Sequence, residues 1–107
     1  MSEEFLREMR ERIIVELLDV LILGSLNESA SPMGGYDVIS LVRKRFGVLL
    51  SSGTVYGLIY AMEREGLIRG MLERRKRVYK LTEKGKEIIQ SVQQRKNEII
   101  RLIKMLL

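Results

Sequence analysis

Cysteine, histidine and tryptophan are absent from this 107-residue chain, and proline occurs once, as Pro32. These absences exclude disulfide bonds, metal sites built on thiolates or imidazoles, and serine–histidine catalytic triads. The carboxylates are scattered along predicted helix faces, and no glycine-rich loop suited to binding a phosphate is present. We therefore expect a protein that is not an enzyme and that has no metal ion or other cofactor.

Long apolar runs are also absent. The longest, residues 13–26, is interrupted by Glu16 and Asp19 and is shorter than the roughly 20 residues that a membrane span needs. The chain begins with acidic residues rather than with a basic secretory signal. We expect a cytoplasmic protein with no membrane partner, and the length predicts a single domain over residues 1–107.

The net positive charge is confined to one part of the chain. Residues 1–35 carry seven acidic and three basic side chains, whereas residues 36–107 carry sixteen basic and seven acidic ones. A surface with such a basic region suits a polyanion, and nucleic acid is the commonest partner of that kind. A solvated basic face is the alternative that charge alone leaves open.

Apolar periodicity and turn residues predict three helices in the first two thirds of the chain. The first covers residues 3–26 and ends before Pro32, which forbids continuation. The second follows Gly34 and Gly35 and stops at Gly47. The third begins at residues 51–54, where a serine hydroxyl can cap its free amides, and ends at Gly66.

Two short apolar segments, residues 67–72 and 78–81, predict the strands of a β-hairpin. The connecting residues 73–77 are one glutamate followed by four consecutive cations. Like charges at this density repel one another, so they are favoured where solvent screens them or an anion neutralises them. After the hairpin, Thr82 is suited to cap a helix that we expect to run without a break over residues 82–107.

The first and last helices have apolar stripes that a domain of this size cannot bury. The last helix alone is about 37 Å long at 1.5 Å per residue, and its apolar residues are spaced close to a heptad. A second copy of the chain is the expected cover, and the predicted dimerisation residues are Leu6, Met9, Ile13, Ile88, Val92, Ile99, Ile103 and Leu106. The same side chains could line a pocket for a flat hydrophobic effector, but plain packing is favoured because no tryptophan is present to stack on such a molecule.

The order helix, helix, helix, strand, basic tip, strand, helix matches a helix-turn-helix followed by a wing. The predicted fold class is α+β, mainly α, with flanking N- and C-terminal dimerisation helices. In such a fold the third helix enters the major groove, and the wing lies over the phosphates or in the minor groove. The predicted DNA-binding residues are Tyr36, Ser51, Ser52, Thr54, Tyr56, Tyr60, Arg64, Arg74, Arg75, Lys76 and Arg77.

Some of these residues have structural alternatives. Tyr56 and Tyr60 are four residues apart, so they point outward together unless one of them packs in the core. Arg77 contacts DNA or, alternatively, fixes the base of the wing. The cations at positions 43–45 contact DNA or simply complement the dipole at the end of the second helix.

Four motifs in this order resemble the PadR family of winged-helix transcriptional regulators over roughly residues 14–90. They are Gly35-Tyr36-Asp37, Ser52-Gly53-Thr54-Val55-Tyr56, Glu63-Arg64-Glu65-Gly66-Leu67-Ile68 and Arg77-Val78-Tyr79-Lys80-Leu81-Thr82-Glu83-Lys84-Gly85. The single C-terminal helix is similar to that of the compact subfamily, in which it packs against the N-terminal helix of the partner. The resemblance implies transcriptional repression, often relieved by a small molecule.

The chain departs from the family at Gly34, Gly57, Tyr60 and Ala61, which replace residues that are usual there. We therefore expect the wing cations to contribute a larger share of the DNA binding. The main hypothesis is thus a homodimeric repressor of a palindromic operator, with a small hydrophobic effector as a further partner. The alternatives are an architectural DNA-binding protein without effector and a winged-helix module for protein interaction.

Overall fold

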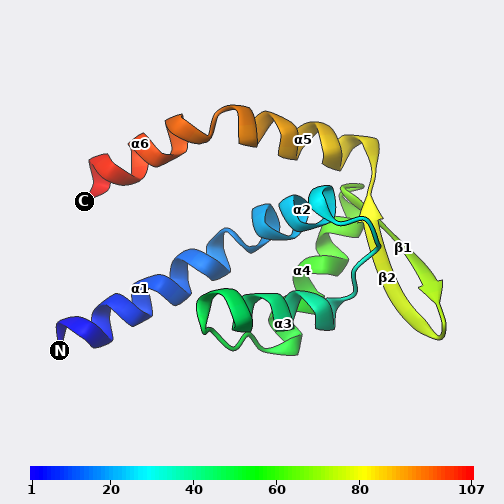
Figure 1. Cartoon of the computed structure of the whole chain (residues 1–107), viewed down its shortest axis with the longest axis horizontal. Helices are drawn as coiled ribbons and strands as arrows, with labels where there is room; N and C mark the ends of the chain where they lie inside the picture. Colours follow the sequence, from blue (N-terminus) through cyan, green and yellow to red (C-terminus); the bar gives the residue numbers. More distant parts are fainter.

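The computed structural model describes residues 1–107 and contains six helices and a two-stranded antiparallel sheet (Figure 1). The elements are α1 (Ser2–Glu16), α2 (Leu18–Glu28), α3 (Gly35–Phe46), α4 (Ser52–Arg64), β1 (Ile68–Glu73), β2 (Lys76–Leu81), α5 (Glu83–Gln94) and α6 (Lys96–Leu106). This architecture confirms the predicted fold class, which is mainly α with one β-hairpin. None of the helices combines the length and the apolarity that a membrane span requires.

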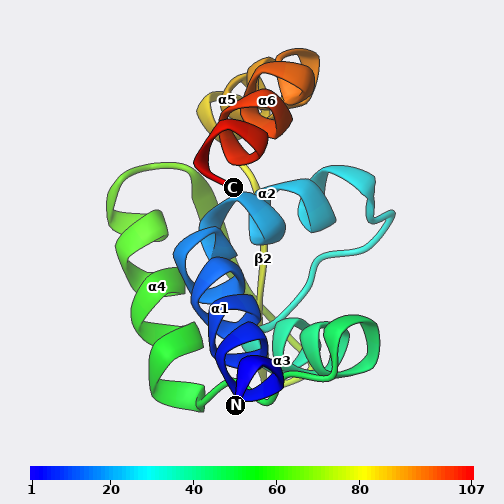
Figure 2. The ribbon, with the colours of Figure 1, turned by 90° about the vertical axis from the view of Figure 1, so that its left-hand side faces the viewer.

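The hydrophobic core is a cluster of 15 buried side chains. Leu18 of α2, Val42 of α3 and Val55 of α4 have no exposed surface, and Tyr79 of β2 and Ile89 of α5 are each 2% exposed. Seen along the long axis of the molecule, α5 and α6 lie on one side of α2, and α3 and α4 lie on the other (Figure 2). The same core therefore fixes the α3–α4 pair and the hairpin relative to one another.

The prediction of one continuous N-terminal helix was wrong, because the helix bends at Leu17 (φ −102°, ψ 18°). The bend leaves the hydrogen bonds in place, since Leu17 N–H still donates to Ile13 O (3.0 Å) and Leu21 N–H to Leu17 O (3.0 Å). α2 lies in the core, whereas α1 buries only Ile14. The bend thus lies at the boundary between the exposed α1 and the buried α2.

The prediction of an unbroken helix over residues 82–107 was also wrong, because Arg95 (φ −108°, ψ 22°) separates α5 from α6. The N–H of Arg95 is shared between Ser91 O (3.2 Å) and Val92 O (3.1 Å). The residues around the break, 93–98, are all polar or charged, so no apolar contact holds the helix straight there. α6 contains no buried residue.

The predicted helix caps are confirmed. Ser51 Oγ accepts the N–H of Thr54 at 3.1 Å, and Thr82 Oγ1 accepts the N–H of Gly85 at 3.1 Å. Gly47 (φ 70°) and Gly66 (φ 77°) both have the left-handed conformation that ends a helix. These four residues set the end of α3, both ends of α4 and the start of α5 close to the predicted positions.

The hairpin is tighter than predicted. Its strands pair from Ile68 opposite Leu81 to Glu73 opposite Lys76, so only Arg74 and Arg75 form the turn. The prediction of a five-residue connection over 73–77 was wrong, because the ladder continues into the charged segment. On its other edge β2 pairs with Met33, which precedes α3.

The end of α4 is joined to the start of α5 by polar contacts around Thr82. Thr82 Oγ1 donates to Gly66 O (2.6 Å), Thr82 N–H donates to Leu67 O (3.2 Å), and Lys84 Nζ donates to Glu65 O (2.9 Å). At this junction the buried Gly85 lies directly against the carbonyl of Leu67, and a Cβ at position 85 would overlap with that oxygen.

We predict that Gly85→Ala lowers the free energy of unfolding by about 1–3 kcal/mol, because the backbone of Leu67 cannot move aside as a side chain would. Gly57→Ala is the matched control, since a Cβ at position 57 meets nothing within 4 Å. It should raise the free energy of unfolding by about 0.5–1 kcal/mol through helix propensity. Urea denaturation of both variants measures the difference, and equal effects would contradict the close approach.

Candidate nucleic-acid interface

The face of α4 that is turned away from the core is largely exposed to solvent. Val55, Ile59 and Met62 are buried, with at most 2% of their surface exposed. On the opposite side Tyr60 is 46% exposed, and Gly57 is exposed beside it. This arrangement leaves one side of α4 free for another molecule.

Three tyrosines lie around the starts of α3 and α4. Tyr36 is 61% exposed at the second position of α3. The half-buried Tyr56 lies against Gly35, where an added Cβ would come within 2.5 Å of Tyr56 Cζ. The rings of Tyr56 and Tyr60 are 6.1 Å apart between centroids. Tyr56 is therefore partly packed, while Tyr36 and Tyr60 are exposed.

The polar residues at the start of α4 are also exposed. Ser51 Oγ accepts the N–H of Thr54 and donates to Thr54 Oγ1 at 2.8 Å, while Ser52 has no side-chain hydrogen bond. Arg64 is exposed as well, but it lies at the other end of the helix. Ser52 and Arg64 are separated by about 18 Å along the axis at 1.5 Å per residue, so the structure does not bring Arg64 together with the serines.

The four cations of the hairpin fall into two pairs. Arg74 and Arg75 form the turn, with φ angles of 51° and 67°. Two positive φ angles define a type I′ turn, in which asparagine and glycine are the favoured residues. Neither arginine lies within ion-pair distance of a carboxylate. Their guanidinium groups are therefore free to bind an anion.

Lys76 and Arg77 lie in β2 rather than in the turn, and each has a carboxylate partner. Because successive side chains of a strand point to opposite faces, the two cations reach different helices. Lys76 Nζ lies 3.9 Å from Oδ1 of Asp37 in α3, and Asp37 Oδ2 also accepts the N–H of Gly34 at 2.7 Å. Arg77 Nη2 lies 2.7 Å from Oε2 of Glu63 in α4.

Arg77 makes further contacts at the base of the hairpin. Its Nε donates to the phenol oxygen of Tyr79 at 3.2 Å, and its guanidinium lies 5.6 Å from the centroid of that ring. The hydrogen bond to Tyr79 and then that to Glu63 raise the pKa of Arg77. Burial raises the pKa of Tyr79, and the hydrogen bond from Arg77 opposes that shift. At neutral pH the pair is therefore a charged guanidinium donating to a neutral phenol.

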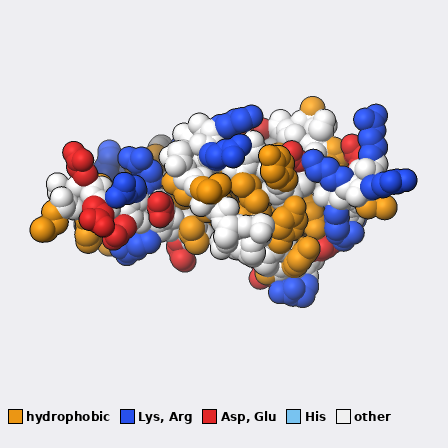
Figure 3. Space-filling view, turned by 90° about the horizontal axis from the view of Figure 1, so that it is seen from below, with side chains coloured by type: hydrophobic (Ala, Val, Ile, Leu, Met, Phe, Trp, Pro, Cys, Tyr) orange, Lys and Arg blue, Asp and Glu red, His pale blue; other side chains and the backbone are white.

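Seen from below, basic side chains gather at the right-hand end, over the hairpin, and others lie along the upper edge (Figure 3). Side chains of the hydrophobic class, in which the figure includes tyrosine, lie between these basic groups. The left-hand end, formed by α1, has mixed charge. This face thus has the composition of a surface that contacts phosphates with cations and bases or sugars with apolar groups.

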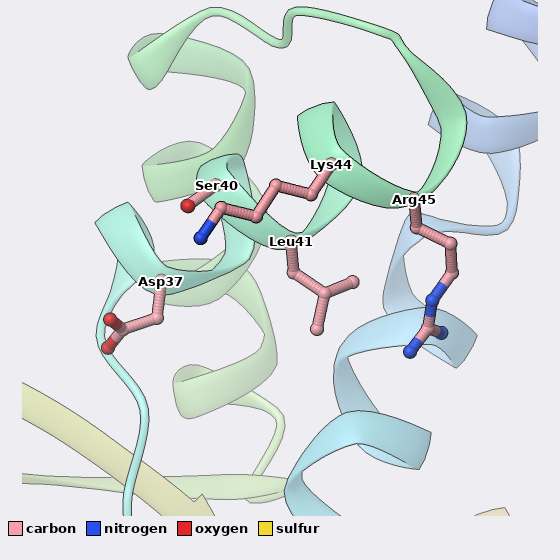
Figure 4. A pocket seen from close by; sticks show the side chains of 5 residues that line it. All are labelled: Asp37, Ser40, Leu41, Lys44 and Arg45. Carbon is pink, nitrogen blue, oxygen red and sulfur yellow. The ribbon is translucent and has the colours of Figure 1, made fainter.

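A shallow hollow of about 500 Å³ lies on the outer side of α3 and is lined by Asp37, Ser40, Leu41, Lys44 and Arg45 (Figure 4). The side chains of Lys44 and Arg45 point away from each other, with Leu41 between them. Asp37 already pairs with Lys76. Arg45 therefore does not converge with the other polar groups that line the hollow. DNA contact by the cations at positions 43–45 stays a prediction.

Sequence reasoning assigned no role to Glu63, Gly70 and Tyr79, which position Arg77. Gly70 was the available signal, because glycine inside a strand often marks the close approach of another group. An added Cβ at position 70 would lie 2.5 Å from Arg77 Nη2. Asp37 was missed for a different reason, since its partner Lys76 was expected in the turn.

Helices α3 and α4, followed by a hairpin that packs on the same core, define a winged helix-turn-helix protein. A family model matches residues 22–96 and is described as the transcriptional regulator PadR-like family. The protein belongs to this family of transcription regulators. It is thus a DNA-binding winged-helix protein and not an enzyme, as the sequence predicts.

Solved structures support the same assignment of the fold. A PadR-like transcriptional regulator from Bacillus cereus is 23% identical, with a TM-score of 0.75 over 89% of this chain and 95% of that one. A PadR family transcription regulator from Clostridium difficile is 25% identical, with a TM-score of 0.72 over 84% and 97%. F93 from STIV, a winged-helix DNA-binding protein, is 24% identical, with a TM-score of 0.59 over 85% and 92%. A comparison with curated proteins gives no match.

The turn geometry leads to a prediction about stability. An L-residue other than glycine, asparagine or aspartate in the left-handed region costs about 1–2 kcal/mol. Arg74→Asn combined with Arg75→Gly should therefore raise the free energy of unfolding by about 1 kcal/mol. Thermal denaturation at fixed protein concentration should show a rise in Tm of about 5 °C. An unchanged or lower Tm would mean that the two arginines stabilise the turn in another way.

Proposed function

We propose that the protein is a homodimeric transcriptional repressor that binds a palindromic operator in double-stranded DNA. In this proposal α4 lies in the major groove and the wing, β1 and β2, lies along the neighbouring phosphates. The observation that carries it is the exposed face of α4 beside a turn whose two arginines have no carboxylate partner. The proposed place of action is the cytoplasm, as the sequence suggests.

The proposed DNA contacts follow from where the predicted residues lie. Arg74 and Arg75 would bind phosphates, because free guanidinium groups are well suited to them. Tyr36, Ser52 and Tyr60 are exposed residues, and their hydroxyl groups would donate to phosphates or base edges. Ser51, Thr54, Tyr56, Arg64, Lys76 and Arg77 remain in the proposed interface, either as direct contacts or as residues that position the others.

The apolar surfaces of α1 and α6 support the proposed homodimer. Leu6 is 58% exposed, Ile13 is 48% exposed and Leu106 is 76% exposed. Both helices extend toward the end of the molecule where the two termini lie (Figure 1). Exposed apolar residues of this kind mark an interaction site, and a two-fold dimer covers the same surface on both copies. A palindromic operator then matches the two copies of α4.

A groove of about 330 Å³ continues this apolar surface between α2 and the last two helices. Its apolar lining comes from Val20, Ile89, Val92, Ile99 and Ile100. A helix of the partner is the occupant that we propose, because the groove joins the exposed stripe of α6. A small hydrophobic effector, which the family resemblance implies, is the alternative occupant of this groove.

The proposal is tested by selecting bound sequences from a random pool of duplexes with the purified protein. We expect enrichment of one inverted repeat, with half-sites about 10 base pairs apart and a preference over random DNA of about 10³ or more. Equal binding of all duplexes would instead favour an architectural protein. No binding even at low salt would favour a module for protein interaction.

The Arg74→Asn and Arg75→Gly double variant tests whether the two arginines of the turn bind phosphates. If both arginines bind phosphates, it should bind operator and random duplexes more weakly by the same factor. The slope of log affinity against log salt should then fall by about 1.8, at about 0.9 per lost phosphate contact. Loss of discrimination with an unchanged slope would mean that the turn reads bases.

The dimer is tested by replacing Ile99 and Ile103 of α6 with glutamate. Because α6 has no buried residue in one chain, the substitutions should leave the fold intact, as circular dichroism would show. They should convert the dimer to a monomer in sedimentation equilibrium, since buried charges without partners are costly. Arg101→Glu, two positions from Ile99 on the other side of α6, is the matched control and should remain dimeric. A dimer that survives both isoleucine substitutions would place the interface elsewhere.

A further inference from the structure

The edge of β1 that faces α4 is completed by a side chain instead of by another strand. The N–H of Tyr79 donates to Met33 O at 2.8 Å, and Met33 N–H donates to Tyr79 O at 3.1 Å. Both backbone groups of Tyr79 thus turn away from its partner Gly70 in β1. In an antiparallel pair of this kind the backbone groups of the partner also point outward. The N–H of Gly70 does so, and it donates to Glu63 Oε2 at 3.2 Å.

The same carboxylate oxygen binds Arg77. Arg77 Nη2 lies 2.7 Å from Glu63 Oε2, and Arg77 Nε donates to the hydroxyl of Tyr79 at 3.2 Å. The guanidinium passes over Gly70, where any side chain would displace it. Glu63 therefore binds both strands of the hairpin from α4, β1 through a backbone amide and β2 through a guanidinium. We call Glu63, Gly70, Arg77 and Tyr79 the wing-base network.

An isolated ion pair at this exposure would contribute little, because the side chains of Arg77 and Glu63 are 51% and 30% exposed. Here the guanidinium donates from two nitrogens to two different acceptors, and one of these acceptors belongs to Tyr79, whose side chain is buried. Fixed geometry of this kind is what arginine provides and lysine does not. Arg74 and Arg75 lack such contacts.

We propose that Glu63 and Arg77 are positioning residues that fix the wing relative to α4, so that Arg77 acts on DNA recognition through geometry and not as a phosphate contact. The proposal rests on the proposed function, in which α4 and the wing bind DNA together. Specific binding needs both elements in register on one duplex, whereas binding to random DNA needs only positive charge.

The proposal and a purely electrostatic role lead to opposite expectations for Glu63. A carboxylate near phosphates repels them, so its removal alone would strengthen binding to every duplex. If Glu63 positions the wing, Glu63→Ala lowers the ratio of operator to random affinity about tenfold, the usual effect of breaking a charge-assisted hydrogen bond. Glu73→Ala is the matched control, because Glu73 is a wing carboxylate with no ion-pair partner, and it should keep the wild-type ratio.

Two further variants keep every charge and disturb only the geometry. Arg77→Lys retains the cation without the planar fork, and Gly70→Ala places a Cβ where the guanidinium lies. Both should lower the operator-to-random ratio about tenfold and leave the salt slope unchanged. If Arg77→Lys keeps the ratio, and Arg77→Gln weakens all duplexes equally with a slope lower by about 0.9, Arg77 is a phosphate contact and the proposal is overturned.

Hydrogen exchange of the Gly70 amide in the free protein tests the network without DNA. Glu63→Ala should accelerate this exchange about tenfold, because the amide loses its acceptor, while Glu73→Ala should not change it. An unchanged rate in Glu63→Ala overturns the proposal. If the wild-type protein shows no preference among duplexes, the proposed function fails, and the exchange rate alone still decides whether Glu63 holds the wing.

Discussion

The position of the wing depends on the buried Tyr79. Its backbone pairs with Met33 before α3, its ring lies in the core, and its hydroxyl accepts from Arg77, which in turn binds Glu63 of α4. One residue of β2 is thereby connected to both helices of the helix-turn-helix. The connection to the α3 side consists of backbone hydrogen bonds, and the connection to the α4 side consists of side chains. Substitutions at Glu63 or Arg77 can therefore change the position of the wing relative to α4 without disturbing the pairing of Tyr79 with Met33.

Much of the fold could be predicted because it depends on local signals. Ser51, Thr82, Gly47 and Gly66 act within a few residues, and each ended or began a helix as expected. The bend at Leu17 gave no such signal, because it lies in a continuous apolar stripe without proline or glycine and arises where the chain leaves the core. The break at Arg95 did have a sequence signal, because a run of polar residues interrupts the apolar stripe of the last helix there. The helical periodicity on either side of the run concealed that signal.

The candidate site was predicted in part. The exposed face of α4 follows from helical periodicity, so Tyr60 and Thr54 could be assigned to it from the sequence. The division of the four wing cations into two free and two paired residues could not be predicted. It depends on a turn in which two arginines adopt positive φ angles, a conformation that is disfavoured for arginine. That turn shifts Lys76 and Arg77 into β2, and only the fold reveals that Asp37 of α3 and Glu63 of α4 meet these two cations.

The division of these cations bears on what kind of DNA-binding protein this is. Free arginines at the turn attract phosphates of any sequence, and an architectural protein needs little more than that. The pairing of Lys76 and Arg77 with carboxylates reduces the attraction to phosphates, which by itself would weaken binding. Such pairing also fixes the angle between α4 and the wing, and that angle matters for recognition of one sequence because both elements must fit the same duplex. The braced wing base therefore favours a sequence-reading regulator over an architectural protein.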